Sequence, residues 1–219
     1  MNGRDALRAR VRGLYAITPE TAGDAELRRK CAAALRGGAG VLQYRDKTAA
    51  ASTKRRRAFL LRALCADFGA LFVVNDDLAL AAETEADGVH LGIADGDIAR
   101  AREQCGAKML LGATCHDDLA RAEEARRAGA DYCAFGAIFS SQTKPAARRC
   151  GLEKIAATKQ KFDLPIVAVG GITAQNAGAV FAAGADAVAV CAGLFAAANI
   201  EDAARQIAAQ IQTGAEIQE

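Results

Sequence analysis

Gln43, Arg45 and Lys47 occupy every second position in the stretch VLQYRDK, residues 41–47. In a β-strand, side chains two positions apart point to the same face, so these three polar groups would lie together. Two like charges on one face are costly to bury unless an anion neutralises them. The spacing therefore predicts a strand that leads into an anion-binding site.

Further polar residues stand where other apolar runs of the chain end. Lys144 adds a third cation to Arg45 and Lys47, and Asp76 and Asp95 add two carboxylates. Carboxylates beside a polyanion favour a shared divalent cation, because Mg²⁺ is typically held by one or two carboxylates together with phosphate oxygens. The alternative is that Arg45 and Asp76 only form an ion pair across neighbouring strands.

The two histidines and a neighbouring cysteine give weaker indications of chemistry. His90 alternates with apolar residues, so we expect it to face inward, and we favour a core histidine with satisfied hydrogen bonds over a site residue. His116 is expected to cap a helix that begins at Asp117. Cys115 has no evident basic partner in the sequence and is interpreted as a packing residue.

Eight apolar runs are typical of strands, and amphipathic stretches separate them. The clearest helix is predicted over residues 117–130, with Leu119, Ala122, Ala125 and Ala128 on one stripe, and Gly129 is expected to end it. The predicted strands are residues 14–18, 40–46, 71–76, 88–92, 109–114, 132–139, 165–171 and 187–193.

Strands that alternate with helices predict a parallel sheet, and eight units in about 220 residues favour a closed (β/α)₈ TIM barrel over an open sheet. We expect one domain over residues 1–219. Active sites of such barrels lie at the carboxyl ends of the strands, where the polar residues gather, and the loops after strands 7 and 8 often bind phosphate. Gly170 and Gly171, and then Cys191 and Ala192, stand in those loops, although a double glycine can also be only a turn.

Composition limits the classes of partner. The chain has 219 residues, 52% of them hydrophobic and 25% charged, and a net charge of +2, which gives no indication of nucleic-acid or membrane binding. The basic runs at residues 4–12 and 54–57 are interpreted as solvated helix faces. Uncharged residues 164–185 contain Pro165 and four glycines, so a strand, a loop and a helix are expected there rather than a membrane span.

Seven cysteines without a CxxC pair, after a start that lacks an apolar signal core, predict free thiols and a cytoplasmic location. The expected partners are small-molecule substrates, and the sequence gives no indication of the oligomeric state.

The motifs QYRDK, VNDD, DGVHLG, SSQTKP and VAVGGI, in this order, closely resemble those of the thiamine-phosphate synthase family. The resemblance runs from about Leu14 to Phe195. It implies a transferase that joins 4-amino-5-hydroxymethyl-2-methylpyrimidine diphosphate to 4-methyl-5-(2-hydroxyethyl)thiazole phosphate. The implied products are thiamine monophosphate and pyrophosphate, and the implied cofactor is Mg²⁺.

The resemblance also assigns roles to individual positions. The substrate-binding residues it implies are Gln43, Arg45, Lys47, Asn75, Thr114, Ser141, Thr143, Lys144, Gly170, Gly171, Cys191 and Ala192; the metal ligands are Asp76 and Asp95; the catalytic cations are Arg45, Lys47 and Lys144.

The chain departs from the family pattern in a few places. Ile93 and Ala94 replace two polar residues beside Asp95, Ala192 replaces a common serine, and Thr114 replaces another serine. Three alternatives remain: a thiazole tautomerase that uses a histidine at the position of His116, a non-catalytic thiamine-phosphate binding protein, and a phosphate-sugar isomerase. The isomerase would need an acid–base pair that the sequence does not offer, and the intact diphosphate motifs favour the synthase.

Overall fold

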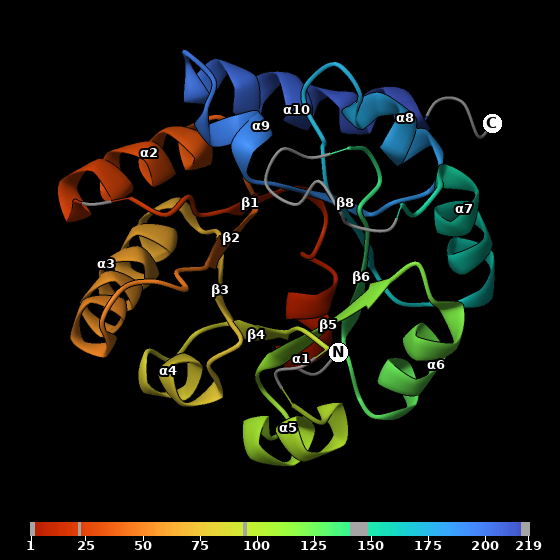
Figure 1. Ribbon diagram of the computed structural model, residues 1–219, viewed down its shortest axis with the longest axis horizontal. Helices are drawn as coiled ribbons and strands as arrows, with labels where there is room; N and C mark the ends of the chain where they lie inside the picture. The colour runs from red at the N-terminus through yellow and green to blue at the C-terminus, as the bar shows by residue number, and fades with distance from the viewer. Residues whose placement is uncertain (1–2, 22, 94–95, 141–148, 216–219) are drawn as a thin grey trace.

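A computed structural model describes residues 3–21, 23–93, 96–140 and 149–215 of the chain. Eight parallel strands form a closed barrel in sequence order, and β8 pairs with β1 to complete it (Figure 1). The strands are β1 (Gly13–Ile17), β2 (Val41–Tyr44), β3 (Leu71–Asn75), β4 (Gly88–Leu91), β5 (Leu110–His116), β6 (Tyr132–Phe135), β7 (Ile166–Val169) and β8 (Ala187–Val190). The predicted (β/α)₈ barrel is confirmed.

Helices surround the barrel, and at least one follows each strand (Figure 1). Two of them lie outside the strand–helix alternation: α1, which precedes the first strand within the basic run interpreted as a helix face, and the short α9 between β8 and α10, which was not predicted. The helices are α1 (Gly3–Arg8), α2 (Asp24–Arg36), α3 (Ala51–Phe68), α4 (Leu78–Glu83), α5 (Ile98–Cys105), α6 (Leu119–Arg127), α7 (Leu152–Lys161), α8 (Ala177–Ala182), α9 (Ala192–Phe195) and α10 (Ile200–Ala215).

Aspartate side chains cap the amino-terminal ends of three of the helices that follow strands. Asp77, Asp97 and Asp118 accept hydrogen bonds from backbone N–H groups of the first turns of α4, α5 and α6. Such caps satisfy donors that have no partner inside the helix. The predicted cap by His116 is therefore wrong: α6 begins at Leu119, and the shorter side chain of Asp118 reaches its first turn.

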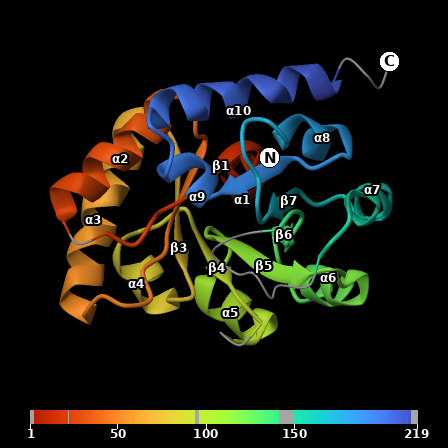
Figure 2. The same ribbon diagram turned by 45° about the horizontal axis from the view of Figure 1, so that its top comes forward.

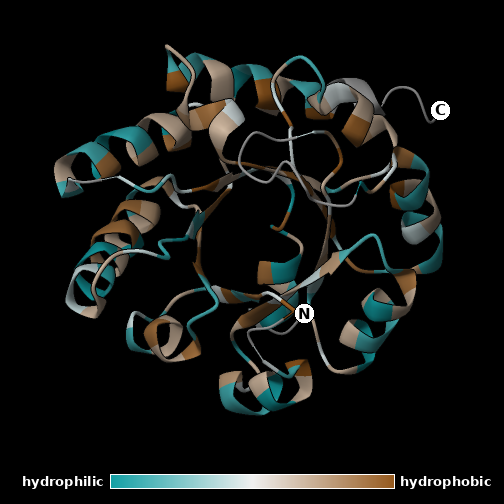
Figure 3. Ribbon diagram, viewed as in Figure 1, coloured by the Kyte–Doolittle hydropathy of each residue, from teal (hydrophilic) through white to brown (hydrophobic). Residues whose placement is uncertain are grey.

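The strands separate two apolar layers, as the alternation of side chains requires. On β1, Tyr15 belongs to a cluster inside the barrel, whereas Leu14 and Ala16 belong to the layer between strands and helices. Figure 3 shows that the strands are mainly hydrophobic, while the surrounding helices mix hydrophobic and hydrophilic residues. The larger layer therefore holds the helices on the barrel.

Helix α1 closes one end of the barrel (Figures 1 and 2). Leu7 of α1 and Val11 just after it pack against the cluster inside the barrel, and Arg4 lies 3.3 Å from Asp131 at the start of β6. The amino-terminal end of the barrel is thus filled. Polar residues at the opposite end remain available for a site.

Several predicted boundaries differ from the observed ones. Strand β2 ends at Tyr44 rather than at Asp46, and β6 ends at Phe135 rather than at residue 139. Residues 164–185 form β7, a loop and α8, as predicted. Among the residues that the structure describes, no helix is both long and apolar enough to cross a membrane. All seven cysteines are free thiols.

Candidate active site at the carboxyl ends of the strands

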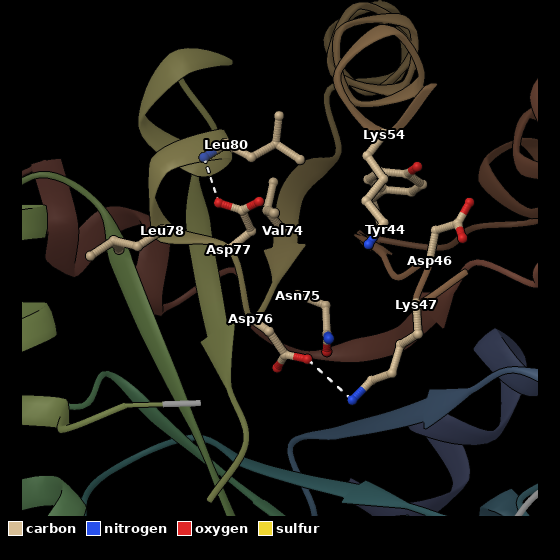
Figure 4. Close-up of a pocket in the computed structure, with 10 residues that line it drawn as sticks. All are labelled: Tyr44, Asp46, Lys47, Lys54, Val74, Asn75, Asp76, Asp77, Leu78 and Leu80. Atoms are coloured by element: carbon tan, nitrogen blue, oxygen red, sulfur yellow. Dashed lines mark hydrogen bonds and ion pairs between the residues drawn. The ribbon is translucent and has the colours of Figure 1, made fainter. Parts of the chain in front are cut away.

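A hollow of about 440 Å³ lies where β2 and β3 end. It is lined by residues of both strand ends and of the loops that follow them: Tyr44, Asp46, Lys47, Lys54, Val74, Asn75, Asp76, Asp77, Leu78 and Leu80 (Figure 4). This is the end of the barrel opposite α1. The QYRDK and VNDD motifs therefore meet in space, as the barrel rule predicts.

Arg45 and Lys47 lie in the loop after β2 rather than on the strand. The hydroxyl of Thr18 accepts a hydrogen bond from the Arg45 N–H at 2.9 Å and donates to the Arg45 carbonyl at 3.1 Å. The side chain of Arg45 is 28% exposed and that of Lys47 is 55% exposed. Both cations are accessible to solvent, and because β2 ends at Tyr44 they do not share a strand face with Gln43, as the alternation had suggested.

Each of these cations already has a carboxylate nearby. Lys47 Nζ lies 3.4 Å from Asp76 Oδ2, and Figure 4 shows the two side chains extended toward one another beside Asn75. Arg45 Nη1 lies 3.7 Å from Glu20 Oε1. The alternative pair of Arg45 with Asp76 is therefore not formed; Lys47 takes that place. Partly exposed pairs of this kind are weak and can exchange one partner for an incoming anion.

A buried ion pair holds the loop that carries both cations. Asp46 Oδ2 lies 2.8 Å from Arg57 Nη1, and the two side chains are 4% and 5% exposed. The other carboxylate oxygen of Asp46 accepts from the N–H groups of Thr48 and Ala49. Burial alone would raise the pKa of Asp46, but these hydrogen bonds and Arg57 outweigh it and lower that pKa. The interpretation of residues 54–57 as a solvated helix face is thus wrong for Arg57, which is buried.

Of the two predicted metal ligands, Asp76 is the one that the structure describes. Its φ of 64° is unusual for a residue other than glycine, and its N–H donates to the carbonyl of His90 at 2.8 Å. Within the described ranges, no group of three or more His, Cys, Asp or Glu side chains converges on one point. A single carboxylate next to accessible cations still fits Mg²⁺, which can take its remaining oxygen ligands from phosphates and water.

His90 lies inside the barrel with both ring nitrogens hydrogen-bonded. Its Nδ1 is 3.2 Å from the hydroxyl of Tyr132, and its Nε2 is 2.9 Å from that of Thr114. Burial lowers the pKa of His90 to about 4, so the ring is neutral near pH 7. The favoured interpretation of His90 as a satisfied inward-facing histidine is confirmed. His116, by contrast, is exposed at the end of β5.

The glycines after β7 pack closely against the loop after β6. Gly170 and Gly171 have φ values of 104° and 64°. A Cβ on Gly170 would lie 2.6 Å from that of Ala137, and one on Gly171 would lie 2.5 Å from the carbonyl oxygen of Ser140. The tight turn is thus a sufficient reason for both glycines, and phosphate binding at these positions stays a prediction.

The strand 8 turn stands beside β1. Cys191 precedes α9, and its Sγ lies 3.9 Å from the carbonyl oxygen of Thr18. Burial raises the pKa of the Cys191 thiol, which is therefore neutral near pH 7. Cys191 and Ala192 can offer backbone N–H groups, whereas neither side chain offers an anionic or cationic contact.

The chain matches the model of the thiamine monophosphate synthase family over residues 14–194. The chain belongs to this family. It is 50% identical to a thiamine-phosphate synthase of Thioalkalivibrio sulfidiphilus over 204 residues, which cover 93% of this chain and 97% of that protein. It is 51% identical to one of Chromobacterium violaceum over 199 residues, 91% of this chain and 96% of that one.

Solved structures agree with the family. A thiamine phosphate pyrophosphorylase from Pyrococcus furiosus superimposes with a TM-score of 0.84 at 32% identity, and the match covers 95% of this chain and 98% of that one. The predictions of the family and of a transferase of the thiamine-phosphate synthase type are confirmed. The departures at Ile93, Ala94 and Ala192 leave the chain within the family.

Among the described residues, Lys47, Asn75 and Asp76 come together at one hollow. Arg45 does not line it but lies in the same loop after β2, where its side chain contacts Glu20. Gln43 and Thr114 lie deeper, at the two ends of a hydrogen-bonded group inside the barrel. The remaining predicted site residues, Asp95, Ser141, Thr143 and Lys144, lie outside the described residues.

Sequence reasoning missed the contribution of β1 to the site of this synthase-family barrel. Thr18 fixes the backbone of Arg45, and Glu20 contacts Arg45 and the loop after it. Thr18 ends the first predicted strand and Glu20 lies two residues further on, so the rule applied to the other strands would have found them. Tyr15 and Tyr132 were also missed, because a tyrosine in an apolar run does not differ from other core residues in sequence.

Proposed function

We propose that the chain joins 4-amino-5-hydroxymethyl-2-methylpyrimidine diphosphate to 4-methyl-5-(2-hydroxyethyl)thiazole phosphate, with thiamine monophosphate and pyrophosphate as products. The observation that carries this proposal is the hollow that Lys47, Asn75 and Asp76 line next to Arg45, in a chain of this family. Lys47 lines the hollow and Arg45 lies two residues before it, and two accessible cations in one loop suit a diphosphate. We further propose that the chain acts in the cytoplasm on small molecules alone, as one domain over residues 1–219.

The proposed reaction is a substitution at the methylene carbon of the pyrimidine. The C–O bond to the diphosphate breaks, and its electron pair stays on the departing oxygen. The cation that remains is stabilised by the amino group of the ring, and the thiazole nitrogen then donates its electron pair to form the new C–N bond. No acid–base pair is required, which agrees with a His90 that is neutral and hydrogen-bonded on both sides.

Arg45, Lys47 and Lys144 would stabilise the charge that grows on the leaving diphosphate. Preorganised cations aimed at developing charge lower a barrier more than they favour the ground state. Arg45 can contact two phosphate oxygens at once, whereas each lysine supplies a point charge. Lys47 would exchange its contact with Asp76 for one with the diphosphate.

Asp76 and Asp95 would hold Mg²⁺ at the ends of β3 and β4. The bound ion supplies positive charge that offsets the charge of the diphosphate. Support comes from the position of Asp76 next to Lys47 and from the oxygen chemistry of its carboxylate. The ammonium of Lys47, 3.4 Å away, orients this carboxylate in the free protein.

The second substrate would lie across the mouth of the barrel. Backbone N–H groups at Gly170, Gly171, Cys191 and Ala192 would bind the thiazole phosphate. Gln43, Asn75, Thr114, Ser141 and Thr143 would line the pockets for the pyrimidine and the thiazole phosphate. Binding both molecules in one orientation converts a bimolecular encounter into a reaction within a complex, which is a large part of the rate gain available to such enzymes.

Asp76→Asn tests the metal ligand, with Asp77→Asn as its control. We expect Asp76→Asn to lower Mg²⁺-dependent turnover at least ~10²-fold, because metal charge stabilisation is worth several kcal/mol. Asp77 turns away to cap α4, and asparagine caps helices equally well, so Asp77→Asn should lose far less. The measurement is product formation from both substrates over a range of Mg²⁺ concentrations. Equal activity of the two variants would remove Asp76 from the metal site.

A further inference from the structure

Five polar side chains form an unbroken hydrogen-bonded chain through the interior of the barrel. Gln43 Nε2 lies 2.9 Å from the Tyr15 hydroxyl, which lies 2.9 Å from that of Tyr132. Tyr132 continues to His90 Nδ1 at 3.2 Å, and His90 Nε2 reaches Thr114 Oγ1 at 2.9 Å. The chain starts on β2, crosses from β1 to β6, and ends on β4 and β5.

The members of this chain differ in their access to solvent. Tyr15 and Tyr132 are buried to 1% and 0% exposure, and His90 is 9% exposed. Thr114 is only partly buried and stands near the carboxyl end of β5. Buried polar groups must pair with one another, so the direction of each hydrogen bond in the interior depends on its neighbours.

The donors and acceptors can be counted from one end. The side-chain NH₂ group of Gln43 can donate hydrogen bonds but cannot accept them, so it donates to the oxygen of Tyr15. Tyr15 then donates its single hydroxyl hydrogen to the oxygen of Tyr132, and Tyr132 donates its own to Nδ1 of His90. Because Nδ1 accepts, the neutral ring carries its hydrogen on Nε2 and donates it to Thr114.

The opposite direction would leave a hydrogen without a partner. If Tyr132 donated to Tyr15, the oxygen of Tyr15 would accept from both sides and its own hydrogen would have no acceptor among the described residues. A buried donor without a partner is costly. Reversal is possible only if Gln43 turns its carbonyl oxygen to Tyr15.

We infer that this chain runs one way, from Gln43 to Thr114, and makes the Thr114 hydroxyl a hydrogen-bond donor toward the mouth of the barrel. His90, Tyr132 and Tyr15 are then positioning residues that act through Thr114. Its partner is an acceptor atom of the bound pyrimidine diphosphate, either a ring nitrogen or a phosphate oxygen. The identity of that partner rests on the proposed function, whereas the direction of the chain does not.

Packing around Tyr132 supports the chain. The Tyr132 ring stacks on that of His90, with 5.6 Å between centroids and 24° between planes. Its partner in register across β5 and β6 is Gly112, and a Cβ on Gly112 would overlap the Tyr132 ring. The missing side chain at Gly112 thus makes room for the ring that links the two halves of the chain.

The direction is tested by nitrogen NMR of the free protein. The protein contains two histidines, so ¹⁵N-histidine labelling gives signals from two imidazole rings, and the variant His116→Asn identifies those of His90. At pH 7 we expect a hydrogen on Nε2 and none on Nδ1 of His90. A hydrogen on Nδ1, or an equal mixture of the two tautomers, would overturn the inference. The result needs no substrate, so it stands even if the proposed reaction fails.

Tyr132→Phe and Tyr44→Phe form a matched pair for the same spectrum. Tyr132→Phe removes the hydrogen that Nδ1 accepts, and the His90 signals should shift toward the other tautomer or a mixture. Tyr44 is also buried, but it lies in the outer layer and not among the five side chains, so Tyr44→Phe should leave the tautomer in place. An unchanged tautomer in Tyr132→Phe would contradict the inference.

Binding to Thr114 variants identifies the acceptor. Thr114→Val removes the donor while it keeps the shape, and Thr114→Ser restores a hydroxyl. If the partner is a ring nitrogen, Thr114→Val should bind 4-amino-5-hydroxymethyl-2-methylpyrimidine about tenfold more weakly, the value of one hydrogen bond. If it is a phosphate oxygen, binding of pyrophosphate should weaken instead. In either case Thr114→Ser should regain most of the affinity. Unchanged binding of both molecules would overturn the role of Thr114 as a donor.

Discussion

Asparagine in place of Asp46 tests whether a buried charge pair holds the loop after β2. Removal of one partner from a buried pair costs about 3–5 kcal/mol, because the other charge stays buried. Arg57 would retain Asp24 at 2.9 Å, and asparagine would retain an oxygen for the N–H groups of Thr48 and Ala49. We therefore expect the lower end of this range, a loss of about 3 kcal/mol in the free energy of unfolding.

Urea unfolding of Asp46→Asn and Asp24→Asn measures this effect with an internal control. Asp24 contacts the same Arg57, but its side chain is 27% exposed, whereas that of Asp46 is 4% exposed. We expect the larger loss for Asp46→Asn, together with a lower kcat/KM for the pyrimidine diphosphate, since the loop carries Arg45. A loss for Asp46→Asn no larger than for Asp24→Asn would refute the reasoning that burial makes this pair strong.

Three further predictions concern the site and the barrel interior. Arg45→Lys should lower kcat/KM about tenfold or more, because a point charge cannot replace two parallel hydrogen bonds, and steady-state kinetics measure this. Between pH 6.5 and about 4 the unfolded chain binds a proton at His90 that the folded chain does not, so the free energy of unfolding should fall by up to about 3 kcal/mol as the pH is lowered through this range. Urea titrations of His90→Asn should lack this part of the pH dependence. Gly112→Ala should destabilise the fold by roughly 1–3 kcal/mol through overlap with Tyr132, as thermal unfolding can measure, and Gly40→Ala, at a less crowded glycine, should cost less.

The sequence was sufficient for the architecture and for much of the site because both follow from regular spacing. Apolar runs at regular intervals predict the strands, and the barrel rule then places Asn75 and Asp76 beside the loop after β2. The hollow at these strand ends confirms that placement. The inward position of His90 followed from simple alternation.

Features that depend on contacts distant in sequence could not be predicted. Arg57 reads as one cation in a basic run, and only the approach of α3 to the loop after β2 buries it against Asp46. The end of β2 at Tyr44 depends on Thr18, which bonds both backbone groups of Arg45 from the neighbouring strand end. Alternation alone would continue the strand, so it placed Arg45 and Lys47 on one strand face with Gln43.

The direct test of the central claim is a product balance with both phosphorylated substrates and Mg²⁺. We predict that the chain forms thiamine monophosphate and pyrophosphate in equal amounts, that omission of either substrate abolishes both, and that Asp76→Asn reduces both together. Pyrophosphate released without thiamine monophosphate would indicate hydrolysis of the pyrimidine diphosphate. Absence of both products from the folded chain would contradict the proposed function.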